Sequence, residues 1–441
     1  MSPAGGRTTV VYAGPTISPD EIREVIPGAR VRPPVARNDL FTEDWAPGDT
    51  AVIIDGYYRE RLSVGHKEIL WLLAEGVRVI GAASLGALRA AELGPYGMRG
   101  VGTIFHMYVT GEIDGDDEVA VLHGPAEVGY PAGTVAMVNL RHGCREGART
   151  GLVPEAVGAR ILSAAKARPF THRTWHELEE DVPEEGVRDG LRTLRQMIAA
   201  GEWDLKRLDA LSALRDARDP GAGSPAARPD DAALTGITRN QALGWGSRRE
   251  YAPGRWMSDL DVLTAARLFD DGYPRLHEQA LTALLADFAA ARGMNLEEYV
   301  RTTLGVAGEL PSPLAAWLTE AEHATLPTGD QLRLVMVRVW PIWKSADWRP
   351  AVMARIRGTE QWEQWADLVA RADEVAEQSR GRLVVPPPEF CGRLFLRHWP
   401  GTPPELAMAC RGFLGVEDLG HAAARFFALD VHRRRTPDGP R

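Results

Sequence analysis

Short, almost wholly apolar segments alternate with amphipathic helices over the first 140 residues, and this alternation constrains the fold more than any other feature of the chain. Strands are predicted at 8–13, 29–32, 50–54, 77–80 and 118–122, and helices from Ser18, over 64–75, over 84–93 and around 134–141. Continuously apolar strands separated by helices are typical of a mainly parallel sheet that helices cover on both faces. The N-terminal part is therefore predicted to have an α/β fold.

Beyond about residue 150 the chain shows helical periodicity only. A segment rich in Gly, Pro, Ala and Ser at 220–229 interrupts the helices and predicts a flexible linker. We expect an α/β core at 8–148, a helical extension of the core at 149–219, the linker at 220–229 and a mostly α-helical C-terminal region at 230–441. A length of 441 residues also predicts two or three domains.

Composition and charge argue against several classes of protein. The net charge of −9, with no basic run carrying interleaved aromatic residues, favours a protein with no nucleic-acid partner. No apolar run reaches the roughly 18 residues that a membrane span needs, and the N-terminus does not have the pattern of a signal peptide. Cys144, Cys391 and Cys410 lie far apart, without zinc-site spacing. We expect a cytoplasmic protein with no metal, no cofactor and no membrane association.

Open parallel sheets bind their ligands at the carboxyl ends of the strands. At three predicted strand ends the chain carries Gly14, the pair Asp55 and Gly56, and the turn at 82–86. These three segments are therefore expected to lie together and to bind substrate.

Ser84 lies where a predicted buried strand turns into a helix. Strand, tight turn and helix is the order of a nucleophile elbow, although the spacing Gly-x-x-Ser-x-Gly is one residue longer than the usual motif. The N–H groups of Leu85, Gly86 and Ala87 are expected to be free at the helix start, where they can bind an anion or a developing oxyanion. Three functions of Ser84 stay open at this point: helix N-cap, anion binder or nucleophile.

Four further polar residues lie on the predicted helices 64–75 and 84–93. His66, in a first helical turn, is a candidate general base, although a surface or capping residue is the simpler interpretation. Lys67 can bind a carboxylate or belong to a solvated helix face. Arg89 and Glu92 share a helix face at spacing i, i+3, which predicts an ion pair. The alternative function of Arg89 is to bind an anion one turn above Ser84.

Acidic residues crowd a turn before the last predicted strand of the core. Asp114, Asp116, Asp117 and Glu118 can bind Mg²⁺ or Ca²⁺, but their spacing is not that of an EF-hand loop, and a polar turn is the simpler interpretation. Asp117 and Glu118 also belong to the ordered series described next, so a function in the cleft stays open for them.

Six segments, in the same order and at similar spacing, resemble the TfuA-like family. They are Tyr12-Ala13-Gly14-Pro15, Asp55-Gly56, His66-Lys67-Glu68-Ile69-Leu70, the residues 81–93 around Ser84, Gly97-Met98-Arg99-Gly100-Val101-Gly102, and Asp116-Asp117-Glu118-Val119-Ala120-Val121. The resemblance covers roughly residues 8–145, with an extension to 200 left open. It does not extend to the C-terminal half, whose function it leaves open.

The resemblance implies a function in thioamide formation. TfuA-like proteins accompany YcaO-type proteins, which use ATP to activate a backbone amide, and the resemblance implies release of sulfur from a thiocarboxylated ubiquitin-like carrier. The implied partners are a YcaO-type protein, that sulfur carrier, and a precursor peptide or protein substrate. The chain has no glycine-rich phosphate loop, so ATP chemistry is assigned to the YcaO-type partner.

Three hypotheses for the function follow. The first is a hydrolase that acts on a protein C-terminal thiocarboxylate. The second is a non-catalytic binding module that docks precursor peptide or carrier and activates the YcaO-type partner. The third is a small-molecule enzyme with no connection to thioamides. Ser84 and His66 assembled with an acid would favour the hydrolase, whereas separated side chains would favour the binding module.

Overall fold

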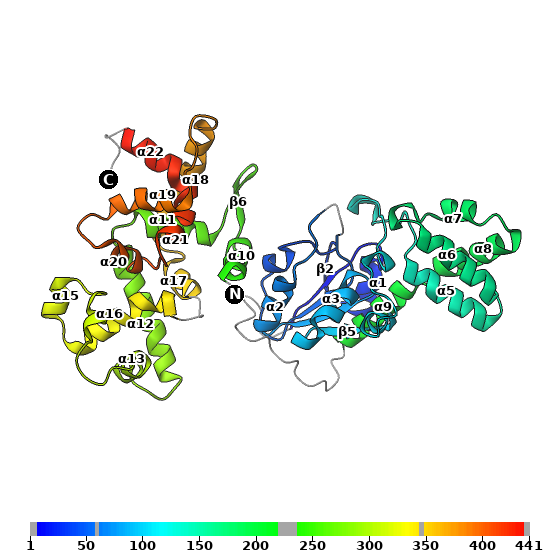
Figure 1. Ribbon diagram of the computed structural model, residues 1–441, viewed down its shortest axis with the longest axis horizontal. Helices are drawn as coiled ribbons and strands as arrows, with labels where there is room; N and C mark the ends of the chain where they lie inside the picture. Colours follow the sequence, from blue (N-terminus) through cyan, green and yellow to red (C-terminus); the bar gives the residue numbers. More distant parts are fainter. Residues whose placement is uncertain (1–6, 58–60, 219–235, 344–347, 436–441) are drawn as a thin grey trace. The chain divides into compact units, whose positions relative to one another are not determined.

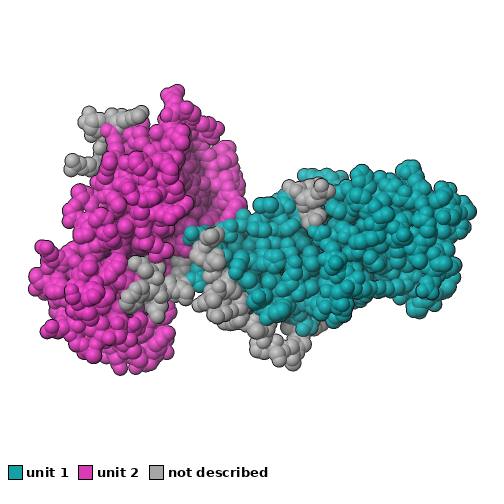
Figure 2. Space-filling model, viewed as in Figure 1, with its two compact units in different colours: residues 1–242 teal, residues 243–441 magenta. Residues whose placement is uncertain are grey.

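The computed structural model describes residues 7–57, 61–218, 236–343 and 348–435. The chain divides into two compact units, unit 1 at Met1–Ala242 and unit 2 at Leu243–Arg441 (Figure 2). The linker predicted at 220–229 lies outside the described residues. A parallel sheet with flanking helices is followed by a mostly helical region, which confirms the predicted fold class.

A five-stranded, wholly parallel sheet forms the centre of unit 1 (Figure 1). Its strands are β1 (Thr9–Tyr12), β2 (Arg30–Arg32), β3 (Thr50–Ile53), β4 (Arg78–Ala82) and β5 (Arg99–Val101). In the spatial order β2-β1-β3-β4-β5, β2 lies on one side of β1 and the later strands lie on the other side. The prediction of a strand at 118–122 is wrong. Asp116–Glu118 is a 3₁₀ turn there, and β5 completes the sheet.

Helices cover both faces of the sheet because alternate side chains of the apolar strands point to opposite sides. On one face, α2 (His66–Ala74) and α3 (Leu85–Leu93) pack against the side chains of Val10, Ile53 and Val79. On the other face, α1 (Pro19–Val25) and α9 (Leu205–Arg218) pack against those of Val11, Val52 and Ile80. A short helix, α4 (Thr103–Val109), follows β5 and shares a core with α3 and α9.

The helices between the sheet and α9 have a core of their own. They are α5 (Met137–Thr150), α6 (Glu155–Ala167), α7 (Trp175–Asp181) and α8 (Glu185–Ala199). After them the chain returns to the sheet as α9. There the Asp209 carboxylate accepts the N–H groups of Thr103 (2.9 Å) and Ile104 (2.7 Å) at the start of α4. This return brings residues beyond 200 to the strand ends.

Unit 2 is built from helices and one hairpin, β6 (Arg249–Ala252) and β7 (Arg255–Met257). The helices are α11 (Asp259–Phe269), α12 (Tyr273–Ala290), α13 (Leu296–Leu304), α14 (Ser312–Ala315), α15 (Glu320–Thr325), α16 (Thr328–Trp343), α17 (Arg349–Ile356), α18 (Glu360–Gln378), α19 (Pro388–Phe395), α20 (Pro404–Ala409), α21 (Val416–Ala423) and α22 (Phe427–Arg435). The helix α10 (Gly236–Gly246) spans the boundary between the units. Within the described ranges, no helix is both long enough and apolar enough to span a membrane.

Candidate active site

Three strand ends meet at one edge of the sheet, as the topology of a parallel sheet requires. The buried Asp55 carboxylate follows β3 and accepts the N–H of Gly14 (2.9 Å), which follows β1. It also accepts the N–H (3.0 Å) and the hydroxyl (2.6 Å) of Thr16. Asp55 thus ties the loop after β1 to the end of β3. The β4–α3 turn, which contains Ser84, lines the same pocket as Asp55.

Two of the glycines at this edge are required by close packing. A Cβ atom on Gly86 would lie 1.8 Å from the carbonyl oxygen of Ile53, and one on Gly56 would lie 2.1 Å from Leu85 Cδ2. The helix α3 therefore approaches the end of β3 backbone to backbone. Any side chain at Gly86 is expected to disrupt packing here, so a substitution at this position reports on folding.

The turn that leads into Ser84 has an unusual backbone. Ser84 N–H donates to the carbonyl of Ala82 (2.7 Å), which closes a three-residue turn around Ala83 at φ +65°. A γ-turn with positive φ at a residue other than glycine is rare and strained. Ser84 occupies the N-cap position of α3, but its side chain makes no capping hydrogen bond. Among the described residues its hydroxyl has no hydrogen-bond partner, and it lines the pocket.

The N–H groups at the start of α3 differ from expectation. Gly86 N–H donates to the carbonyl of Ile54 (3.2 Å), and Ala87 N–H donates to that of Ser84 (3.0 Å). The prediction that these two groups are free is therefore wrong, because α3 hydrogen-bonds directly to the end of β3 and its own first turn is closed. In the part of the chain that the structure describes, Leu85 N–H has no acceptor, so it is the donor available to an anion.

Lys206, in the first turn of α9, lines the pocket with Ser84. Only 4% of the residue is exposed; its ammonium donates to the carbonyl of Val119 (3.0 Å) and lies 3.9 Å from Asp55 Oδ1. Burial lowers the pKa of Lys206, and the carboxylates of Asp55 and Asp204 partly oppose that change. A buried lysine with a lowered pKa that lines the same pocket as a serine hydroxyl is a candidate proton acceptor.

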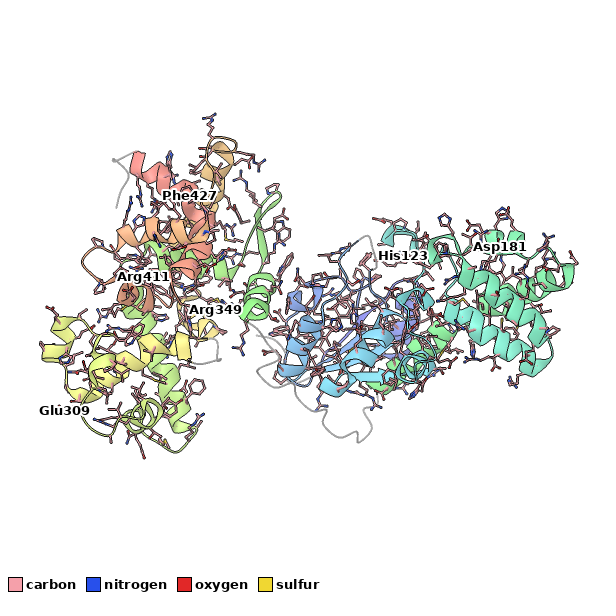
Figure 3. The ribbon with its side chains drawn as sticks, viewed as in Figure 1. His123, Asp181, Glu309, Arg349, Arg411 and Phe427 are labelled. Carbon is pink, nitrogen blue, oxygen red and sulfur yellow. The ribbon has the colours of Figure 1, made fainter. Side chains whose placement is uncertain are left out.

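The rest of the pocket comes from the loop after β3 and the segment after the 3₁₀ turn. Its lining residues are Pro15, Asp55, Gly56, Tyr57, Ser84, Leu85, Asp116, Val119, Ala120, Val121, Leu122, His123 and Lys206. His123 Nδ1 forms a 2.8 Å hydrogen bond with the carbonyl of Gly124. The ring of His123, labelled in Figure 3, lies 6.0 Å from that of Tyr57 and 5.4 Å from that of Tyr130. The imidazole in this pocket is therefore that of His123.

His66 lies elsewhere. It is exposed at the start of α2, and its Nε2 forms a 2.8 Å hydrogen bond with Glu92, which also pairs with Arg89 (2.6 Å). Glu92 follows Ser84 by eight residues on α3, a rise of about 12 Å along a helix. The structure thus brings His66, Arg89 and Glu92 together, but it does not bring them to Ser84. Lys67, next to His66, is exposed and does not line the pocket.

Asp117 and Glu118 lie behind the pocket wall. Lys166 contacts both carboxylates (2.9 and 2.8 Å), and Arg141 binds Glu118 through two hydrogen bonds of 2.8 and 3.0 Å. Burial alone would raise the pKa of Glu118, but the hydrogen bonds from Arg141 and Lys166 bring it below its ordinary value. Within the described ranges, no group of three or more acidic, His or Cys side chains is arranged to hold a metal ion. The two carboxylates anchor the wall.

Lys206, His123 and Tyr57 are not among the residues predicted from the sequence. One signal could have identified Lys206, because it occupies a position on the apolar face of the segment 205–218, where a charged residue needs a buried partner. His123 and Tyr57 left no signal, since each lies in an irregular segment.

The fold and the pocket define an open, parallel α/β protein with a serine and a lysine at the carboxyl ends of its strands. Residues 55–174 match the model of the family described as TfuA-like protein. The match supports the resemblance over this segment, which is similar to a family associated with thioamide formation. The match includes Asp55, Ser84 and His123 and ends before Lys206. No curated protein matches the chain.

Proposed function

We propose that this protein releases sulfur, as hydrosulfide, from the C-terminal thiocarboxylate of a ubiquitin-like carrier. A YcaO-type partner then uses the sulfur to convert a backbone amide of a precursor peptide or protein into a thioamide. The observation that carries this proposal is the hydroxyl of Ser84, which follows a strained turn, has no hydrogen-bond partner in the described chain, and shares its pocket with the buried Lys206. The family match supports the thioamide context.

The proposed reaction has two steps. Ser84 Oγ adds to the thiocarboxylate carbon, the tetrahedral oxyanion accepts the N–H of Leu85, and the C–S bond breaks. The hydroxyl proton passes through Lys206 to the sulfur, so that hydrosulfide leaves and an acyl ester remains on Ser84. Water then hydrolyses the ester, which restores the serine and leaves the carrier with a carboxylate. Burial lowers the pKa of Lys206, so it releases a proton more readily than an exposed lysine does.

One observation favours a second function. His66 and Glu92 lie apart from Ser84. These residues therefore do not form the group of serine, histidine and acid that would favour the hydrolase. A binding module that docks carrier or precursor and activates the YcaO-type partner needs no such assembly. In that case the pocket holds the carrier's C-terminus without bond cleavage.

Sulfide release from a thiocarboxylated ubiquitin-like carrier by the purified chain separates the two functions. Ser84→Ala is expected to lower the rate by at least about 10³-fold, because a nucleophile is lost. Ser212→Ala, a serine of α9 whose hydroxyl donates to its own helix (3.0 Å), is the matched control and is expected to keep full activity. Lys206→Met is expected to be inactive. Its melting temperature is measured in parallel to check that the variant is folded. Full sulfide release by Ser84→Ala would refute the nucleophile and leave the binding module as the stronger function.

A further inference from the structure

Unit 2 contains a second polar pocket, between α12, α15, α16 and α20. Arg411, which follows α20 and is labelled in Figure 3, lines it although only 4% of the residue is exposed. One terminal nitrogen of its guanidinium, Nη1, donates to the carbonyls of Arg267 (2.7 Å) and Asp270 (2.8 Å). Within the described ranges, Nε and Nη2 have no acceptor, and no carboxylate oxygen lies within 4.0 Å of the guanidinium.

The two carboxylates that line this pocket already have cationic partners. Glu322 is bound by Arg338 through hydrogen bonds of 2.6 and 2.8 Å, and Glu278 pairs with Arg333 (2.9 Å). Glu322 accordingly has a pKa of about 2: burial raises it, but the hydrogen bonds from Arg338 and Thr319 outweigh burial. The charge of Arg411 is therefore left without a carboxylate of its own inside the pocket.

The surroundings of Arg411 confirm that its charge is desolvated. The Trp399 ring lies over the guanidinium, 4.6 Å from its centre, and burial lowers the pKa of Arg411 to about 10. His277 also lines the pocket, with Nε2 buried and without a partner. Burial lowers the pKa of His277 to about 3, so its ring is neutral and adds no charge. A buried cation of this kind is destabilising unless an anion reaches it.

We propose that unit 2 binds a carboxylate in this pocket, held side-on by Nε–H and Nη2–H of Arg411. These two N–H groups point in parallel along one edge of the guanidinium, a geometry that matches the two oxygens of a carboxylate. Of the other arginines that line the pocket, Arg338 is already neutralised by Glu322 and Arg275 is exposed, so a carboxylate fits the single buried, unpaired charge better than a phosphate dianion does. The carboxylate is the C-terminus of a peptide or a small organic acid. The inference does not depend on sulfide release by unit 1.

Cys410 gives a direct readout, because it lines the same pocket and is partly exposed, whereas Cys144 and Cys391 are buried. Burial raises the pKa of the Cys410 thiol, so its alkylation is best followed at mildly alkaline pH. The rate at which N-ethylmaleimide modifies Cys410 in the full chain is measured by mass spectrometry of the tryptic peptide. Acetyl-glycyl-glycine, its C-terminal amide and succinate are added as probes.

The expected result is protection of Cys410 by at least fivefold with a free carboxylate and none with the amide. Stronger protection by acetyl-glycyl-glycine assigns a peptide C-terminus, and stronger protection by succinate assigns a small acid. Arg411→Lys keeps the charge but loses the two parallel N–H donors, and should raise the probe concentration that gives half-maximal protection about tenfold. Arg301→Lys, an arginine that pairs with Glu297 and does not line the pocket, is the matched control.

A second variant covers the case in which Arg411→Lys disturbs folding, because Nη1 of Arg411 donates to two carbonyls at the C-terminal end of α11. Thr402→Trp fills the pocket from its partly exposed rim and leaves the guanidinium in place. It should abolish protection at an unchanged melting temperature. Equal rates with carboxylate and amide in the unmodified chain, or full protection in the folded Thr402→Trp variant, would overturn the proposal.

Discussion

Single buried carboxylates in unit 1 differ in pKa according to the partners that each one has. Glu68 accepts the N–H groups of Gly65 (2.9 Å) and Asn38 (2.7 Å), yet burial dominates and raises its pKa to about 7. Asp209, also held by backbone N–H groups, has its pKa raised by burial to about 6. Glu118, which is bound by arginine and lysine, has a lowered pKa. Hydrogen bonds from two side-chain cations therefore outweigh burial at Glu118, whereas backbone N–H groups and the partly exposed Arg37, 3.3 Å away, do not outweigh it at Glu68.

The raised pKa of Glu68 predicts a pH dependence of stability. The folded state binds the proton more tightly than the unfolded state, so this contribution is complete below pH 4.5 and is lost as the pH rises to about 7. Glu68→Gln should remove a decline on the order of 3 kcal/mol over that window. Urea unfolding at intervals from pH 4.5 to 8 measures it. The difference between the two profiles isolates Glu68, because Asp209 titrates in both chains, and the exposed Asp20→Asn is the control. Parallel profiles for Glu68→Gln and the unmodified chain would contradict this prediction.

Elements of unit 1 hold the pocket together through contacts that are distant in sequence. The wall at 116–123 carries no regular hydrogen-bonded ladder and depends on the helices behind it. Arg173, fully buried, donates to the Asp117 carbonyl (3.0 Å), the Asp117 carboxylate (3.2 Å) and the carbonyl of Ala165 (3.0 Å). The bundle α5–α8 thus positions the wall of the pocket.

Removal of this anchor should loosen the wall. Arg173→Met leaves the Asp117 carbonyl and the Ala165 carbonyl without that donor, and is expected to cost about 3–5 kcal/mol of stability. Hydrogen exchange of the amides at 117–121 should become faster than in the unmodified chain, while β3 and β4 stay protected. Arg149→Met removes only an exposed pair with Glu146 and should change neither quantity measurably. Unchanged exchange at 117–121 in Arg173→Met would show that the wall does not depend on this arginine.

The whole molecule consists of two units, each with hydrophobic clusters of its own. The clusters of unit 1 contain only residues up to Ala217, and the buried members of those of unit 2 begin at Met257. A unit with its own core is expected to fold alone. The proposed sulfide chemistry belongs to unit 1 and the proposed carboxylate site to unit 2.

Fragments 1–218 and 236–441 should therefore each unfold cooperatively when they are produced separately. The first should release sulfide from the thiocarboxylated carrier, and the second should show protection of Cys410 by a carboxylate. Calorimetry of both fragments, with the full chain as control, tests the folding, and the two assays test the functions independently. A fragment that shows no unfolding transition would contradict the independence of the units.

Much of the fold could be predicted from the sequence because it depends on local patterns. Apolar runs identified four of the strands that the sheet contains, and helical periodicity identified α2 and α3. The prediction that Gly14, Asp55 and the Ser84 turn lie together needed only the rule that parallel strands end at the same edge. These features depend on residues within a few positions of one another, or on topology alone.

Other features were decided by tertiary structure. Lys206 reaches the pocket because α9 buries its apolar face against the sheet. His66 pairs with Glu92 and His123 enters the pocket because of where α3 and the irregular wall lie. Gly86 N–H is occupied because the packing of α3 on β3 places it beside the carbonyl of Ile54. Local sequence determines which segments form strands and helices, but the partner of a side chain or an N–H group is set by packing between segments that are distant in the chain.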